Sequence, residues 1–252
     1  MKKILILFII PFLNFSQSPD FNWASACSIG SDIGQNVFSV HIDDNGNNYV
    51  CGKSWTETGN SSVQDGFIAK FNNDGQQEWF FEFDSEFECQ VTDVTVMNNE
   101  VYVVGTFSGE MQITDNMDNW ISSYTCSNCD PGDGTFFAKL DMNGNLIWIN
   151  HPENNVFPVA VEHYNNSIYI PMPITSSSGY QTDMLIINQD GNIIQTQNQI
   201  APIMALDMKI DLDGNIIITG KKSSIDPDLG TYIYKFDSEF NLIWSNYVED
   251  GT

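Results

Sequence analysis

One stretch decides the fold, and it runs from Val37 to Phe83: VFSVHIDDNGNNYVCGKSWTETGNSSVQDGFIAKFNNDGQQEWFFEF. Apolar and polar residues alternate in several of its segments, as they do in strands that bury one face. The turn sequences DDNGN and NNDG separate these segments, because Asn, Asp and Gly tolerate the positive φ that hairpin turns require. The stretch therefore predicts two hairpins that together form a four-stranded antiparallel unit ending in a strand with Trp79.

The same pattern returns three more times along the chain. Its second segment recurs as VYVVG (101–105), IYIP (168–171) and IIITG (216–220), and its third as TFFAKL (135–140), MLII (184–187) and TYIYKF (231–236). Trp148 and Trp244 recur at the place of Trp79, where the third copy has Gln195. Because a single sheet cannot cover its own apolar face, such repeats pack against their neighbours. We expect units at about 36–83, 89–150, 156–199 and 203–247, with an extra strand at 23–30.

These units predict an all-β fold, a β-propeller repeat with four four-stranded antiparallel blades. Pro171 and Pro173 cannot donate hydrogen bonds to a ladder, so we expect the second strand of the third unit to be broken. A tryptophan followed seven residues later by glycine precedes a unit at Trp23 and recurs at Trp244. The chain is therefore expected to be an incomplete part of a larger propeller.

The N-terminal residues 1–18 predict export. Lys2 and Lys3 precede an apolar run at 4–15, and Ser16 and Ser18 supply small residues for cleavage. This arrangement is typical of a secretory signal peptide. We therefore expect residues 19–252 to form the repeat domain of a secreted or cell-surface protein.

The run GNNYVCG…DGFIAKFNNDGQQEWFFEF resembles the SBBP-type repeats of bacterial secreted β-propellers. It is more distantly similar to the tryptophan-bearing blades of pyrroloquinoline-quinone-like propellers. The resemblance covers nearly the whole chain after the signal peptide, and it implies the fold without an activity. The Asn- and Ile-rich usage is similar to that of exported Bacteroidota proteins, many of which use type IX secretion. Arginines to clamp a quinone cofactor and a vicinal cysteine pair are both missing, so we predict no such cofactor.

The charge balance excludes several partners. The formal net charge is −24, and the nine basic residues are all lysines. Binding to nucleic acid requires clustered Lys and Arg, so a nucleic-acid partner is excluded. Insertion into a membrane and attraction to an anionic lipid surface are not expected either.

Metal and disulfide candidates are few. Asp211, Asp213 and Asn215 have the opening spacing of a calcium loop, but the bidentate Glu of such a loop is missing, and turn formation alone explains these residues. Calcium is therefore the one metal considered, and no cofactor is predicted. Cys126 and Cys129 predict a local disulfide or two free thiols in an exported protein, because the second ligand pair that a zinc site requires is missing.

No catalytic constellation stands out. His41, His151 and His163 lie at unrelated repeat positions and form no metal-binding pair. Trp55 and Trp120 lie outside the repeated tryptophan position, next to polar residues. They predict either aromatic platforms for carbohydrate or protein ligands, or rings packed under their own loops.

The sequence thus favours a non-catalytic binding or scaffold module whose contacts come from loops at 53–65 and 106–133. One alternative is a polysaccharide hydrolase or lyase that uses carboxylates at a channel mouth. Another is a stalk in a larger exported protein.

Overall fold

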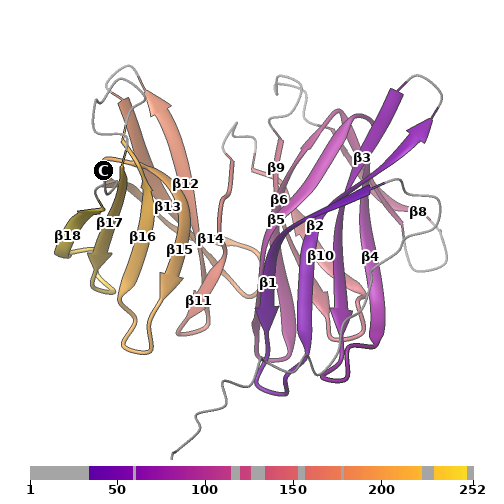
Figure 1. The fold of residues 1–252 in the computed structure, drawn as a ribbon, viewed down its shortest axis with the longest axis horizontal. Helices are drawn as coiled ribbons and strands as arrows, with labels where there is room; N and C mark the ends of the chain where they lie inside the picture. The colour runs from indigo at the N-terminus through magenta and orange to yellow at the C-terminus, as the bar shows by residue number, and fades with distance from the viewer. Residues whose placement is uncertain are drawn as a thin grey trace, which may run out of the picture.

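A computed structural model describes residues 34–58, 61–114, 120–125, 134–152, 157–176, 179–222 and 230–248. All regular elements in these ranges are β-strands, which confirms the predicted all-β class. The strands form one curled ten-stranded sheet and two four-stranded antiparallel sheets (Figure 1). Within the same ranges, no helix is long and apolar enough to cross a bilayer.

The ten-stranded sheet contains two successive meanders and one additional hairpin. The first meander consists of β1 (Gly34–Ile42), β2 (Asn48–Thr58), β3 (Ser61–Phe71) and β4 (Gln77–Ser85). The second consists of β5 (Glu88–Met97), β6 (Glu100–Ser108), β9 (Gly134–Asp141) and β10 (Leu146–Asn150). Between β6 and β9 the chain forms a hairpin of β7 (Glu110–Thr114) and β8 (Trp120–Thr125), and β7 also pairs with β4.

The two smaller sheets are one meander each. The third meander consists of β11 (Glu162–Tyr164), β12 (Ser167–Ser176), β13 (Gly179–Asn188) and β14 (Ile193–Ala201). The fourth consists of β15 (Met204–Ile210), β16 (Ile216–Lys221), β17 (Thr231–Phe236) and β18 (Leu242–Val248). Each strand is antiparallel to the next, so the chain repeats one four-stranded plan four times.

The two prolines of the third meander do not break a strand, contrary to the expectation from sequence. β12 runs through Pro171 and Pro173 and pairs with β13 at both. The irregularity lies instead in the neighbouring β11, whose pairing with β12 ends at Tyr169, two residues before Pro171. Because proline has no N–H, it removes donors from one side of its strand only.

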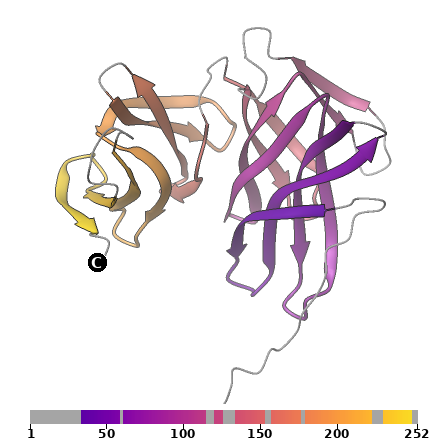
Figure 2. The same ribbon diagram turned by 45° about the horizontal axis from the view of Figure 1, so that its top comes forward.

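The core lies between successive meanders. One buried cluster joins the first and second meanders around Phe83, Phe107 and Phe136. A second cluster joins the second and third, and a third cluster joins the third and fourth. The ten-stranded sheet and the smaller sheets accordingly lie side by side in both views (Figure 2). Since each meander buries its faces against its neighbours, the repeat explains where the apolar residues lie.

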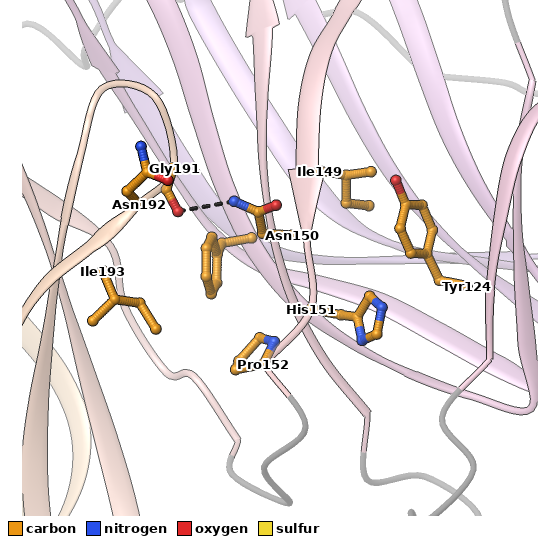
Figure 3. A pocket seen from close by; sticks show the side chains of 9 residues that line it. Tyr124, Ile149, Asn150, His151, Pro152, Gly191, Asn192 and Ile193 are labelled. Atoms are coloured by element: carbon orange, nitrogen blue, oxygen red, sulfur yellow. Dashed lines mark hydrogen bonds between the residues drawn. The ribbon is translucent and has the colours of Figure 1, made fainter.

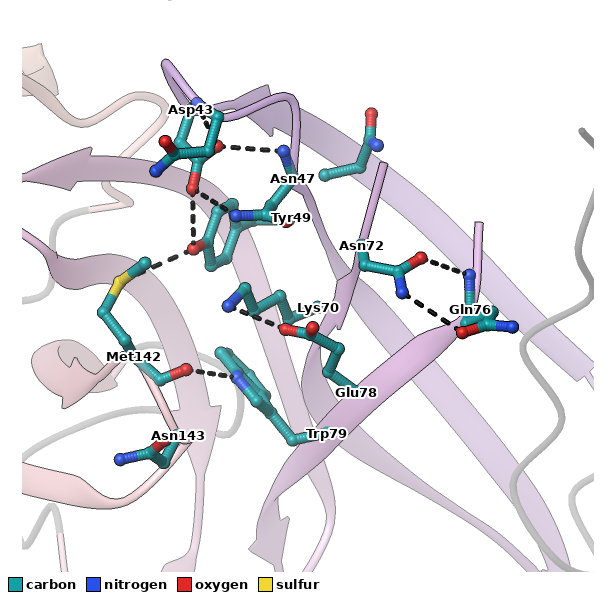
Figure 4. Close-up of polar contacts among 12 residues, drawn as sticks. Asp43, Asn47, Tyr49, Lys70, Asn72, Gln76, Glu78, Trp79, Met142 and Asn143 are labelled. Carbon is teal, nitrogen blue, oxygen red and sulfur yellow. Dashed lines mark hydrogen bonds and ion pairs between the residues drawn. The ribbon is translucent and has the colours of Figure 1, made fainter. Parts of the chain in front are cut away.

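Tryptophans on the last strand of two meanders bond to the following meander. The indole Nε1 of Trp79 donates to the carbonyl oxygen of Met142 at 2.9 Å (Figure 4), and that of Trp148 donates to Gln189 at 3.0 Å. Met142 and Gln189 hold the same place in their turns, directly after the Asx residue that begins the turn. The tryptophan position therefore marks the contact between one repeat and the next.

Candidate functional site

The first strands of the meanders surround a hollow of about 430 Å³, which we call the first-strand hollow. Its lining comes from the first strands of three meanders and from Val159, just before the third meander: Val37, Phe38, Ser39, Val40, Thr92, Asp93, Val159, Leu206, Asp207 and Lys209. The first strands of three meanders carry a β-bulge at this level. Phe38, Thr92 and Leu206 are the residues that these bulges leave without a register partner. A bulge adds one residue to a strand and redirects its side chain, and bulges are common beside binding sites.

The third meander contributes to the hollow from the corresponding position. Val159 lies three residues before Glu162, the partner of Tyr169, just as Phe38 lies three residues before His41, the partner of Tyr49. Four residues at equivalent positions of the repeat thus line one hollow, although the residue type differs at each of the four positions.

Asp93 ties three meanders together at the wall of this hollow. It is 6% exposed and accepts hydrogen bonds from Ser39 Oγ in the first meander and from the backbone N–H of Val161 in the third, at 2.7 Å. Burial raises the pKa of this carboxyl above its ordinary value, against the effect of these hydrogen bonds. Its contacts make Asp93 a positioning residue for the first strands.

Next to Asp93, Lys209 forms an ion pair with Glu162. Burial also raises the pKa of Glu162, although its hydrogen bond to Lys209 acts in the opposite direction. The only positive charge among the described residues that line the hollow is therefore already paired with a carboxylate.

Two of the three histidines come together further along the first strands. His41 and His163 line a polar hollow of about 550 Å³ with Asp43, Asp44 and neighbouring asparagines. His163 Nδ1 lies 3.1 Å from Thr95 Oγ1. Burial lowers the pKa of both imidazoles, and for His41 the nearby His163 lowers it further. These histidines occupy unrelated positions of the repeat in the sequence. Only the packing of the meanders brings them into one hollow.

A third hollow, of about 370 Å³, lies where the second meander meets the third, and we call it the hairpin hollow. Its lining residues are Tyr124 of β8, Phe137, Ile149, Asn150, His151, Pro152, Gly191, Asn192 and Ile193. Figure 3 shows Tyr124 and His151 on one side and Ile193, beyond the turn at Gly191, on the other. The ring centroids of Tyr124 and His151 are 5.1 Å apart, at an interplanar angle of 68°. Asn150 Nδ2 donates to the Gly191 carbonyl at 2.8 Å and joins the two walls.

The tryptophans singled out from the sequence lie in strands and not in loops. Trp55 belongs to β2 and is half-buried, and its ring lies directly over Gly34 of β1. Trp120 is the first residue of β8 and pairs with Thr114. The described parts of the segments expected as contact loops belong mostly to the strands of hairpins, namely the ends of β2 and β6, the start of β3, and β7 and β8. Cys126 and Cys129 lie outside the described residues.

The calcium candidates lie in one of six similar turns. Asp211 Oδ1 accepts the backbone N–H groups of Asp213 and Asn215, and Oδ2 accepts Lys235 Nζ at 2.8 Å. These bonds, first of all the one from Lys235, hold the pKa of Asp211 well below its ordinary value. The same two backbone bonds recur at Asp43, Asn72, Asp141, Asn188 and Asp237. No group of three metal-binding side chains occurs among the described residues.

Sequence reasoning missed most of the residues that line the first-strand hollow and the hairpin hollow. Phe38 had a detectable signal, because the adjacent apolar pair Val37 and Phe38 interrupts the alternation of β1. Tyr124 had none, since it belongs to a hairpin that occurs in only one of the four described meanders.

Comparisons with known proteins bear on the fold. No family model matches the chain, and no curated protein sequence matches it either. Among solved structures, the chain is similar to a protein of unknown function from Dyadobacter fermentans, with 12% identity and a TM-score of 0.54, over 84% of this chain and 69% of that one. A protein of unknown function from Bacteroides caccae is similar with 11% identity and a TM-score of 0.38, over 86% of this chain and 83% of that one. The apocarotenoid oxygenase of Synechocystis is similar with 10% identity and a TM-score of 0.48, over 86% of this chain and 50% of that one. Of these three, only the first exceeds a TM-score of 0.5, and at its identity it shows a shared fold alone.

Proposed function

We propose that this chain is the repeat domain of an exported SBBP-type β-propeller protein and that it binds a carbohydrate without transforming it. Both the assignment of the meanders to blades and the nature of the ligand are part of this proposal. The single observation on which the binding function rests is the hairpin hollow, which lies where the repeat departs from its four-stranded plan.

The packing of the meanders supports the propeller architecture. Three buried clusters join four meanders in series, and Trp79 and Trp148 each donate to the turn of the next meander. Trp244 holds the same place in the fourth meander, opposite Lys235, but it is 43% exposed. Within the described part of the chain its Nε1 has no acceptor. We take this face as the place where a further blade packs, in keeping with a larger propeller.

The location and lining of the hairpin hollow support carbohydrate binding. Insertions in a repeat protein tend to mark its binding face, and β7–β8 is such an insertion. The half-buried rings of Tyr124 and His151 meet at an angle, and Ile193 is 53% exposed opposite them. Ring faces and aliphatic groups suit the C–H face of a sugar, while the amide of Asn192 suits its hydroxyl groups.

The same lining favours binding over hydrolysis. Glycoside hydrolysis uses two carboxyl groups on either side of the scissile bond. None of the described residues that line the hairpin hollow is an aspartate or a glutamate. Binding without bond cleavage is the simpler reading of this chemistry.

A panel of neutral oligosaccharides, screened on the purified protein and followed by calorimetry of the best ligand, tests the proposal. We expect saturable binding, and Tyr124→Ala should weaken it at least about tenfold because the contact between this ring and the sugar is lost. Tyr180→Ala, in β13 and outside the hairpin hollow, serves as the matched control and should bind like the wild type.

Two results would contradict the proposal. One is a folded protein that binds no saccharide of the panel, and the other is a Tyr124→Ala variant with undiminished affinity. Release of reducing ends on prolonged incubation with the ligand would support the hydrolase alternative instead.

A further inference from the structure

The first-strand hollow offers apolar walls that are open to solvent. Phe38 and Leu206 are 45% and 50% exposed, and Val37 and Val40 beside them are 58% and 59% exposed. All four line the hollow, two of them as bulge residues that the strand register directs there. Exposed apolar side chains gathered in a concave site favour a ligand with an apolar body.

The charged residues at this hollow indicate which polar group a ligand with an apolar body would carry. Asp93 and Asp207 belong to its lining, and Lys209, the one positively charged residue among its described lining residues, is paired with Glu162. Asp207 is exposed and uses one carboxylate oxygen to accept the backbone N–H of Met208, at 2.7 Å. The carboxyl groups of Asp93, Asp207 and Glu162 therefore outnumber the one ammonium group, that of Lys209. A chain with a net charge of −24 strengthens this field, and a concave site with apolar walls focuses it.

We propose that the first-strand hollow binds a primary alkylammonium group whose aliphatic part contacts Phe38 and Leu206. Asp207 receives the ammonium group because its neighbour Lys209 is already neutralised by Glu162. The ring of Phe38 adds a favourable surface for a cation. This site is separate from the hairpin hollow in its lining residues and in its ligand chemistry.

Calorimetric titration with 1,5-diaminopentane tests the proposal, with 1,5-pentanediol as the uncharged probe of the same length. We expect saturable binding of the diamine, weakening as salt is added, and none of the diol. Asp207→Asn should weaken binding roughly tenfold, as expected for the loss of one ion pair partly shielded from water. Leu206→Ser should weaken it as well, because the apolar wall is reduced.

Asp74→Asn is the matched control, since Asp74 is an exposed turn residue that does not line the hollow. Circular dichroism confirms that each variant is folded. Equal losses in Asp74→Asn and Asp207→Asn would overturn the proposal, because they would indicate only the general attraction of an acidic protein for cations. Equal binding of diol and diamine, or no saturable binding of the diamine to the folded wild type, would also overturn it.

A second amine separates the two sources of such a ligand. Nα-acetyl-lysine amide carries the same ammonium group on a peptide-like unit. Tighter binding of this compound supports a lysine side chain of a partner protein, and tighter binding of the diamine supports a free amine. The sugar titration at the hairpin hollow is an independent experiment, so the failure of one proposal would leave the other intact.

Discussion

At the scale of the residue, His163 makes the stability of the folded protein depend on pH. Its pKa and that of His41 lie below the ordinary value of 6.5, for both mainly because of burial. The unfolded chain therefore takes up protons before the folded protein does as the pH falls. Each of these histidines accordingly contributes stability that is present above pH 6.5 and is lost as the pH falls from 6.5 towards its lowered folded-state pKa.

We expect His163→Gln to reduce this loss, since glutamine does not titrate and still offers a hydrogen-bonding group to Thr95. The measurement is the urea midpoint of the wild type and the variant at several pH values between 8 and 5. The difference between the two proteins isolates His163 from the carboxyl groups that titrate at lower pH. His41→Gln should act in the same direction, and parallel curves for variant and wild type would contradict the assignment.

At the scale of the element, five of the six similar turns place a glycine in the left-handed region, and the sixth has Phe240 there, with a φ of +65°. Gly214 has a φ of +82°, and a Cβ atom there would lie 2.4 Å from a ring carbon of Tyr164 in the neighbouring meander. Gly214→Ala should lower the free energy of unfolding by about 1–3 kcal/mol, through backbone strain and the clash. Leu212→Ala in the same turn is the control. Leu212 is fully exposed, so its variant should stay within about 0.5 kcal/mol of the wild type in denaturant unfolding. Equal effects would show that the turn tolerates a side chain at Gly214.

The strands themselves were predictable to different degrees. The alternating segments and Asx-Gly turns predicted the four-stranded plan, because both signals depend on neighbours in sequence. The path of β12 through Pro171 and Pro173 was predicted wrongly, since the consequence of a missing donor depends on which neighbouring strand it faces. The β7–β8 hairpin was expected as a loop, because a segment without a repeated counterpart carries no periodic signal.

At the scale of the whole molecule, Trp79 tests how the meanders are joined. Trp79→Phe removes the hydrogen bond to the Met142 carbonyl and leaves that acceptor without this donor. We expect the free energy of unfolding to fall by about 1–2 kcal/mol. Trp244→Phe is the matched control at the same repeat position, and it should cost less than about 0.5 kcal/mol, because no described acceptor lies against its indole N–H. If the two variants lost equal stability, the indole hydrogen bond would not be what joins one meander to the next.

The sequence alone determined the repeat, its all-β class, its turns and the positions of its tryptophans, because each of these is encoded by local periodicity and turn chemistry. The acidic charge likewise needs no structure to be known. Only the tertiary structure decided which residues meet. It brought Phe38, Thr92, Val159 and Leu206 into one hollow, and Tyr124 against His151 in another. These residues are far apart in the chain, and their proximity depends on strand register, on β-bulges and on how each sheet packs against the next, none of which is set by residues adjacent in sequence.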